Sequence, residues 1–252
     1  MNSKLKEYLF APRAVCVCCL SLFGTDEGFI CSSCREKLRP LYLPGKSETE
    51  ICLECGEVVD ADACPGCGRR SPPTLRAFSA YEYEGIIRKL VHRFKFGGVY
   101  ALSEWMAGEM LQALAETGKD RFTRIVPVPM YPLRKLIRGY NQAEKLAGEL
   151  SKRLDIPKSD LLRRVRNTKS QVTLATAERR KNLKNAFRAV SRADGERILL
   201  VDDVRTTGST VSECARTLLA AGCENVTVLT FANAKVKEKA PFSEQSDAGN
   251  RT

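Results

Sequence analysis

The sequence contains no run of 18 or more apolar residues, which excludes a membrane-spanning helix of ordinary length. Its first residues show no apolar core followed by a small-residue cleavage site, so we expect no secretory signal and a cytoplasmic protein. The glycine-rich loop with a Lys-Ser/Thr ending that ATP-hydrolysing proteins use is also absent. Aromatic residues make up only 7% of the chain, and they form no periodic platform on which bases could stack.

Positive charge is abundant but unevenly distributed. Lys and Arg number 41 against 30 acidic residues, which gives a formal net charge of +11. Residues 121–188 contain 18 basic and only 5 acidic residues, so this segment carries the whole excess. Such a stretch favours partners that carry phosphate, such as nucleotides, pyrophosphate or nucleic acid, although a solvated helical face would give the same count.

Three regions differ in composition. Residues 1–71 are rich in cysteine, and residues 72–235 alternate apolar strand-like runs with helical patterns. Residues 236–252 are polar and are expected to form a disordered tail. A Ser-Pro-Pro-Thr stretch at 71–74 marks the expected linker between the first two regions.

The second region has the pattern of an α/β domain. Strands are expected over 77–83, 124–129, 197–202 and 226–232, and helices over 86–94, 102–115, 141–154 and 209–221. The run at 197–202 is continuously apolar, as in a strand that is covered on both faces of its sheet. Strands that alternate with helices imply a parallel sheet flanked by helices, with right-handed crossovers.

Nine of the eleven cysteines precede residue 68, and eight of them form four C-x-x-C pairs: Cys16/Cys19, Cys31/Cys34, Cys52/Cys55 and Cys64/Cys67. Without a secretory signal, a disulfide framework is disfavoured. Two such pairs complete a tetrahedral zinc site, so the spacing predicts two structural Zn²⁺ ions in a double zinc ribbon. Sequential pairing closes the shortest loops. Interleaved pairing stays open at this point, as do unligated thiols and a redox or iron–sulfur role.

The segment at 198–210 has the pattern of a phosphate-binding turn. An apolar strand ends in two acids and is followed by a hydroxyl-rich turn and a helix: Asp202, Asp203, Thr206, Thr207, Gly208, Ser209 and Thr210. A helix that begins after such a turn directs backbone N–H groups and its positive end at one point, which suits a monophosphate. Carboxylates one turn away can accept hydrogen bonds from vicinal ribose hydroxyls. The spacing therefore predicts a ribose 5-phosphate site.

This segment resembles the signature by which type I phosphoribosyltransferases bind 5-phosphoribosyl 1-diphosphate (PRPP). More of the chain, from Cys16 to about Ala232, resembles the ComF family of competence proteins, which includes GntX-like members. The similar blocks are the cysteine pairs, VPVP at 126–129, RGYNQA at 138–143, FKFG at 94–97 and the pattern Arg164-x-Arg166-x-Thr168-x-x-Gln171 with Arg179 following. The resemblance implies a type I phosphoribosyltransferase-like α/β domain preceded by a double zinc ribbon, and a role in DNA uptake.

Residue roles follow from this resemblance together with the local chemistry. Asp202 and Asp203 would be the catalytic acids and hold the ribose, and the turn that follows them would hold the 5-phosphate. Arg138 and Asn141 are further expected PRPP contacts, and Asn141 is also placed to cap the next helix. A mobile flap is expected to carry Arg164, Arg166, Gln171 and Arg179.

Two functions remain open on the sequence alone. One is a protein that keeps a PRPP site and passes single-stranded DNA onward in the cytoplasm, together with the proteins of the uptake machinery. The other is an active phosphoribosyltransferase that uses PRPP with Mg²⁺ and stabilises the departing pyrophosphate electrostatically. No base-recognition element is detectable, so no acceptor can be named.

Overall fold

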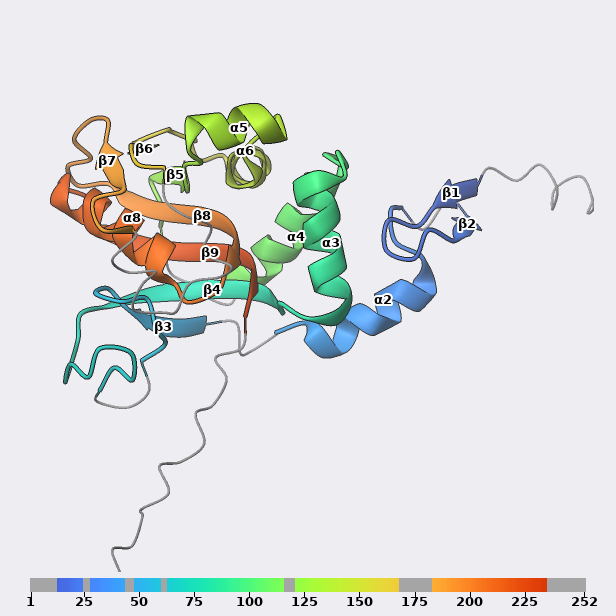
Figure 1. The fold of residues 1–252 in the computed structure, drawn as a ribbon, viewed down its shortest axis with the longest axis horizontal. Helices are drawn as coiled ribbons and strands as arrows, with labels where there is room; N and C mark the ends of the chain where they lie inside the picture. Colours follow the sequence, from blue (N-terminus) through green and yellow to red (C-terminus); the bar gives the residue numbers. More distant parts are fainter. Residues whose placement is uncertain are drawn as a thin grey trace, which may run out of the picture.

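The computed structural model describes residues 13–24, 28–43, 48–59, 63–115, 121–167 and 183–234, arranged around one central sheet (Figure 1). The sheet has five strands in the order β3 (Glu48–Cys52), β4 (Thr74–Glu82), β9 (Asn225–Asn233), β8 (Arg197–Arg205) and β5 (Arg124–Pro127). The last four are parallel, and β3 runs antiparallel to β4 at one edge. The predicted α/β class is confirmed, with the correction that the sheet is mixed rather than wholly parallel.

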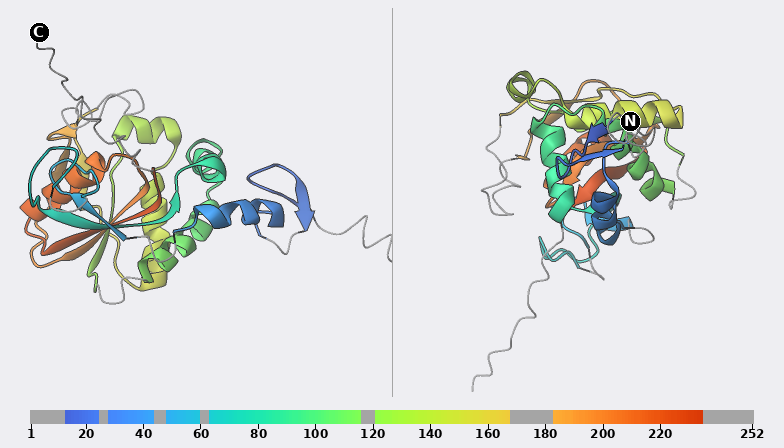
Figure 2. Two further views of the ribbon diagram at one scale, coloured as in Figure 1. Left: turned by 90° about the horizontal axis from the view of Figure 1, so that it is seen from below. Right: turned by 90° about the vertical axis from the view of Figure 1, so that its right-hand side faces the viewer.

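Helices cover both faces of this sheet (Figures 1 and 2). Helices α3 (Gly85–Phe96), α4 (Leu102–Ala115) and α6 (Gln142–Leu154) pack on one face, and α8 (Ser209–Ala220) packs on the other. Side chains of a strand alternate between the two faces, so Leu199 and Val201 of β8 enter the first core while Ile198 and Leu200 enter the second. The apolar run of β8 is thereby explained.

The ends of the elements depart from the sequence prediction in small ways. Strand β8 continues three residues beyond the predicted end, to Arg205, and β5 stops at Pro127, two residues early. The short helix α5 (Pro132–Arg138) was not predicted; it begins with a proline, whose fixed φ suits a first turn, and ends at Gly139 with φ 86°. Asn141 caps α6 as expected, because its Oδ1 accepts a hydrogen bond from the amide of Ala143 at 3.2 Å.

The cysteine-rich region is divided between two places. Strands β1 (Arg13–Val15) and β2 (Leu22–Gly24), helix α2 (Ser32–Leu38) and the 3₁₀ turn η2 (Arg39–Leu41) lie beyond α3 at one end of the molecule (Figures 1 and 2). Strand β3 instead joins the central sheet, in register from Glu48 opposite Phe78 to Cys52 opposite Thr74. The domain boundaries at 71 and 235 stay predictions, and the expected tail at 236–252 lies outside the described residues.

Besides the β1–β2 pair, another two-stranded sheet joins β6 (Leu162–Arg164) to β7 (Phe187–Ala189) beside α8. Residues 165–186 separate these two strands in sequence, and the structure does not describe residues 168–182 within that segment. Within the described ranges, no helix combines the length and the apolar character that crossing a membrane requires.

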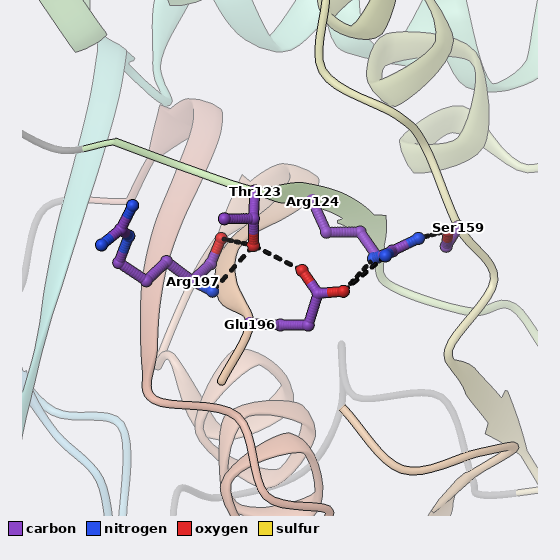
Figure 3. Close-up of polar contacts among 5 residues, drawn as sticks. All are labelled: Thr123, Arg124, Ser159, Glu196 and Arg197. Carbon is purple, nitrogen blue, oxygen red and sulfur yellow. Dashed lines mark hydrogen bonds and ion pairs between the residues drawn. The ribbon is translucent and has the colours of Figure 1, made fainter. Parts of the chain in front are cut away.

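A charged network ties β5 to β8 at the edge of the sheet where both strands begin (Figure 3). The Glu196 carboxylate accepts hydrogen bonds from Arg124, whose Nε lies at 2.9 Å, and from the hydroxyl of Thr123. The guanidinium of Arg124 also donates to the Ser159 hydroxyl at 2.9 Å. Hydrogen bonds from Arg124 and Thr123 hold the pKa of Glu196 below its ordinary value.

Replacing Glu196 by Gln should lower the free energy of unfolding by about 1 kcal/mol at pH 7, because charge-assisted hydrogen bonds in a partly exposed site are lost. The pKa of Glu196 is lower in the folded state, so the contribution is complete above the unfolded-state pKa of about 4.3 and is lost as the pH falls through the folded-state value. Urea unfolding at pH 7 and pH 3.5 measures this. Equal destabilisation at both pH values would contradict the assignment.

Candidate functional site

A pocket of about 500 Å³ opens where the parallel strands end. Its wall includes Tyr83 after β4, residues 128–130 after β5, and residues 202–211 at the end of β8 and the start of α8. Ligands of open α/β sheets bind beyond the carboxyl ends of the strands, because the loops there are free to vary while the strands hold them in place. The pocket is therefore the natural ligand site of this fold.

The turn between β8 and α8 forms one wall of this pocket. Gly208 adopts a left-handed conformation with φ 72° and caps the amino end of α8. The hydroxyls of Thr207 and Ser209 share a hydrogen bond of 3.1 Å across it. All five residues of the predicted phosphate turn, 206–210, line the pocket. The positive end of α8 and these hydroxyls together suit an anion of the size of a phosphate group.

Basic side chains dominate the charge of the pocket. Six of them line it: Arg88, Lys95, Arg134, Arg138, Arg164 and Arg205. Only two acidic side chains, Asp202 and Asp203, line the same wall. This excess of positive charge favours a ligand with more than one phosphate group. Arg138 and Arg164 were expected at the site from the sequence, whereas Lys95 was noted only within the FKFG block at 94–97.

The two acids have different surroundings. Asp203 is buried, and its carboxylate forms an ion pair with Lys95 of α3 at 2.9 Å. Asp202 accepts a hydrogen bond from the amide of Asp203 at 2.9 Å. Burial, followed by the charge of Asp203, raises the pKa of Asp202 to about 7, although Lys95 acts in the opposite direction. Asp202 can therefore gain or lose a proton near neutral pH.

The remaining predicted contacts differ in their placement. Asn141 lines the pocket, but its amide nitrogen donates to the Val128 carbonyl at 3.0 Å, so it also fastens α6 to the end of β5. Arg164 lines the pocket beside the ring of Phe187. Arg166 lies outside it, and its guanidinium donates to the Lys184 carbonyl at 2.7 Å. Gln171 and Arg179, the other two predicted flap residues, fall outside the described residues.

Exposed aromatic rings lie next to the pocket, which the sequence analysis did not detect. The side chain of Phe96 is 63% exposed, and the Arg138 guanidinium lies over its ring at 4.8 Å. Tyr100 is 50% exposed and contacts the ring of Tyr140 edge-on, with 4.7 Å between centroids. These rings come from the end of α3 and from two loops. No helical or strand periodicity could have revealed them.

The eight knuckle cysteines form two separate clusters, one from Cys16, Cys19, Cys31 and Cys34, the other from Cys52, Cys55, Cys64 and Cys67. The cysteines are thus grouped sequentially, an order that the sequence alone left open. Within each cluster the sulfur atoms lie within 4.8 Å of one another. Across the pairs, Cys19 and Cys31 are 3.7 Å apart, and Cys52 and Cys67 are 3.9 Å apart. A tetrahedral Zn²⁺ with Zn–S bonds of about 2.3 Å separates its sulfurs by about 3.8 Å, so both donor sets fit this ion.

Comparison with known proteins decides the family. Residues 141–247 match the family "Phosphoribosyl transferase domain". Over 229 residues the chain is 32% identical to Competence protein F of Haemophilus influenzae, covering 87% of this chain and 96% of that protein. The chain belongs to the ComF family of competence proteins. It is also 34% identical to DNA utilization protein YhgH of Escherichia coli K12, over 85% of this chain and 94% of that one. Competence protein ComFC of Bacillus subtilis is 28% identical, over 83% of this chain and 90% of that protein.

Solved structures give a weaker likeness. Purine phosphoribosyltransferase from Pyrococcus horikoshii is 18% identical over 54% of this chain and 79% of its own, with a TM-score of 0.32. Adenine phosphoribosyltransferase from Thermoanaerobacter pseudethanolicus is 13% identical over 79% of this chain and 99% of its own, also with a TM-score of 0.32. The assignment to the ComF family therefore rests on the sequence relatives.

Replacing Asp202 by Asn should stabilise the ligand-free protein at pH 8. The pKa of Asp202 is about 7 in the folded state, against about 3.9 in an unfolded chain, so the folded state binds more protons between these values. Stability conferred by the parent carboxyl therefore falls as the pH rises from about 4 to about 7, and the amide escapes this loss. We expect a gain on the order of 1 kcal/mol at pH 8 and less at pH 5, after allowing for solvent screening. Urea titrations measure the unfolding free energy of both proteins at pH 5 and pH 8. The same difference between the proteins at both pH values would refute the raised pKa of Asp202.

Proposed function

We propose that this ComF-family protein binds a phosphoribosyl ligand, PRPP or ribose 5-phosphate, in the pocket at the end of β8, and handles single-stranded DNA during natural transformation. The observation that carries the proposal is the meeting of a hydroxyl-rich helix start, an acid pair and six basic side chains in one pocket of about 500 Å³. These are the three chemistries that a ribose carrying both a phosphate and a diphosphate requires.

Each part of such a ligand has a matching group. The turn at 206–210 would receive the 5-phosphate at the positive end of α8. Asp202 and Asp203 would accept hydrogen bonds from the ribose hydroxyls. Arg134 and Arg138, on α5, would face the diphosphate. Mg²⁺ bound to the diphosphate would supply further countercharge, and a ligand phosphate with one or two carboxylates is the setting that this ion prefers.

Three observations support single-stranded DNA as a partner. Residues 121–188 carry the positive excess of the chain, and phosphate contacts of this kind give affinity without regard to sequence. Phe96 and Tyr100 are exposed beside Arg138 and Lys145, so a strand could find stacking and charge together. Two relatives carry names that refer to competence or to DNA utilization.

The alternative is an active phosphoribosyltransferase. The pocket would then hold the ribose C1 in place and stabilise the departing pyrophosphate, which is mainly an electrostatic task. The acid pair with Lys95 and the basic wall favour this reading. Pyrophosphate release from PRPP, measured with a panel of bases, amines and oligonucleotides, separates the two functions. Release that depends on an acceptor would establish the enzyme.

For the cysteine clusters we propose two structural Zn²⁺ ions, one per cluster. All four donors of each site are thiolates of the protein, so neither site keeps a position for a substrate. The sulfur separations support this ion. The two ions would fasten the β1–β2 hairpin to α2 and the β3 knuckle to the loop at 63–70.

At pH 8, above the pKa of about 7 for Asp202, ribose 5-phosphate should bind the parent protein, and the Asp202→Asn variant should bind it on the order of tenfold more weakly, because a charged hydrogen-bond acceptor for the ribose is lost. Inorganic phosphate has no hydroxyl pair, so the same variant should bind it at least as well as the parent does. Asp160→Asn, at an exposed residue paired with Lys158, is the control. Titration calorimetry measures the affinity of the parent and of both variants for each ligand. Equal loss for both ligands, or none for ribose 5-phosphate, would place the ribose elsewhere.

An oligonucleotide of deoxythymidine should bind the parent protein with an affinity that falls as salt is raised, since bound phosphates release counterions. Phe96→Ala should weaken this binding on the order of tenfold, in keeping with about 1–3 kcal/mol for a stacked base. The Ile137→Ala control removes another exposed apolar side chain, 79% exposed on α5, and should change little. Fluorescence anisotropy at two salt concentrations measures both. If the two variants behave alike, Phe96 is not a stacking position.

A further inference from the structure

The second cysteine cluster touches the phosphate turn. Gly56, which directly follows Cys55, has φ +85°, and a Cβ on it would lie 2.2 Å from the carbonyl carbon of Gly208. A Cβ on Gly208 would lie 2.1 Å from the carbonyl oxygen of Gly56. The two backbones are therefore packed against each other, with no room for a side chain at either glycine.

Two hydrogen bonds join the same segments. The hydroxyl of Ser209 donates to the carbonyl of Cys55 at 3.2 Å, and the hydroxyl of Ser212 donates to the carbonyl of Cys52 at 3.1 Å. Both serines are buried, so these hydroxyls and carbonyls would be costly to leave unpaired. The first turn of α8 is thus bonded to the two cysteines of one knuckle.

A third link runs from the end of β8 to β3. Arg205 is buried and lines the pocket, and its Nη2 donates to the hydroxyl of Thr49 at 3.1 Å. The Nε of Arg205 is buried without a hydrogen-bond partner. The strand that leads into the second cysteine cluster therefore also orients a cation of the pocket. The first cluster differs, because β1, β2 and α2 lie away from α8 in both figures (Figures 1 and 2).

We propose that the Cys52–Gly56 knuckle is the scaffold that sets the shape of the phosphate turn, so that Gly56, Ser209 and Ser212 are positioning residues for the ligand. Zn²⁺ held by the four thiolates of the second cluster would restrain the knuckle that carries Gly56. Order at this cluster is thereby coupled to the affinity of a pocket to which none of its cysteines belongs. The expected effect on ligand affinity rests on the proposed phosphoribosyl site, whereas the contact between the knuckle and the turn does not depend on it.

The chain provides a matched pair of glycines for the test. Gly56 and Gly68 each follow the second cysteine of a knuckle in the same cluster, and each amide donates to the first cysteine's carbonyl at 2.8 Å. Both have positive φ, +85° and +69°, so alanine is strained at either position. A Cβ on Gly68 meets nothing within 4 Å, whereas one on Gly56 meets the phosphate turn. The difference between the two variants isolates the contact with Gly208.

Gly56→Ala should keep two zinc ions per chain but bind ribose 5-phosphate at least tenfold more weakly than the parent. Gly68→Ala should keep two zinc ions per chain and bind ribose 5-phosphate within about twofold of the parent. That change is well below the tenfold change that corresponds to about 1.4 kcal/mol. Amide hydrogen exchange across residues 206–212 gives a readout that needs no ligand, and it should speed up in Gly56→Ala alone. Zinc is measured by atomic absorption and affinity by calorimetry.

A milder variant covers the case in which Gly56→Ala fails to fold. Ser212→Ala removes only the hydrogen bond to Cys52 and should weaken ribose 5-phosphate several-fold. Its control is Ser151→Ala, where another helical serine donates to a carbonyl, that of Ile156, at 2.6 Å. Equal affinity and equal exchange in Gly56→Ala and Gly68→Ala, or in the two serine variants, would overturn the inference. A parent that binds no ribose 5-phosphate would instead sink the proposed function, and exchange at 206–212 would still test the contact.

Discussion

Strand β8 is buried on both faces, and the rest of the structure depends on where its apolar run stops. Four consecutive residues, 198–201, fill the two cores, and the first polar side chain that follows lies in the carboxyl-terminal half of β8, on the wall of the pocket. That side chain is Asp202, and Asp203 comes next. Two acids at the end of a buried strand are tolerated only where partners compensate them, and Lys95 supplies that compensation from α3. The position of the pocket follows from this constraint.

The pocket is electrostatically unbalanced without a ligand. Six basic side chains and two acids share a cavity of about 500 Å³, so repulsion among the cations opposes the fold until an anion enters. Arg164 shows the cost, because burial and then the nearby charge of Arg134 lower its pKa. A bound phosphate group would relieve this cost at the same place where α8 presents its positive end. Ligand affinity and local stability are therefore linked.

Much of this arrangement could be predicted from the sequence, for identifiable reasons. Three of its features are local patterns: the apolar run of β8, the glycine and hydroxyls of the turn, and the four C-x-x-C pairs. Such patterns depend only on neighbouring residues, so they can be recognised without knowing the fold. Asn141 was expected to cap α6 and does so, since a cap needs only its own backbone neighbours. Loop length favoured the sequential pairing of the cysteines without excluding the interleaved one, and the structure decides between them.

The features that were missed arise from contacts between distant parts of the chain. Lys95 and Asp203 are more than a hundred residues apart, and the exposed rings of Phe96 and Tyr100 meet basic side chains from other elements. Strand β3 was expected within a separate ribbon, yet its register with β4 brings Gly56 against Gly208. Neither partner of such a pair carries a local signal for the other. Helix α5 was missed for a different reason: seven residues are too few to show a helical period.

We propose above all that the turn at 206–210 holds the phosphate of a phosphoribosyl ligand. A crystal structure of the protein soaked with PRPP and Mg²⁺ tests it most directly. We expect the 5-phosphate at the amino end of α8, the ribose hydroxyls on Asp202 and Asp203, and the diphosphate toward Arg134 and Arg138. A phosphate bound outside this pocket, or a pocket that holds only solvent at saturating PRPP, would contradict it.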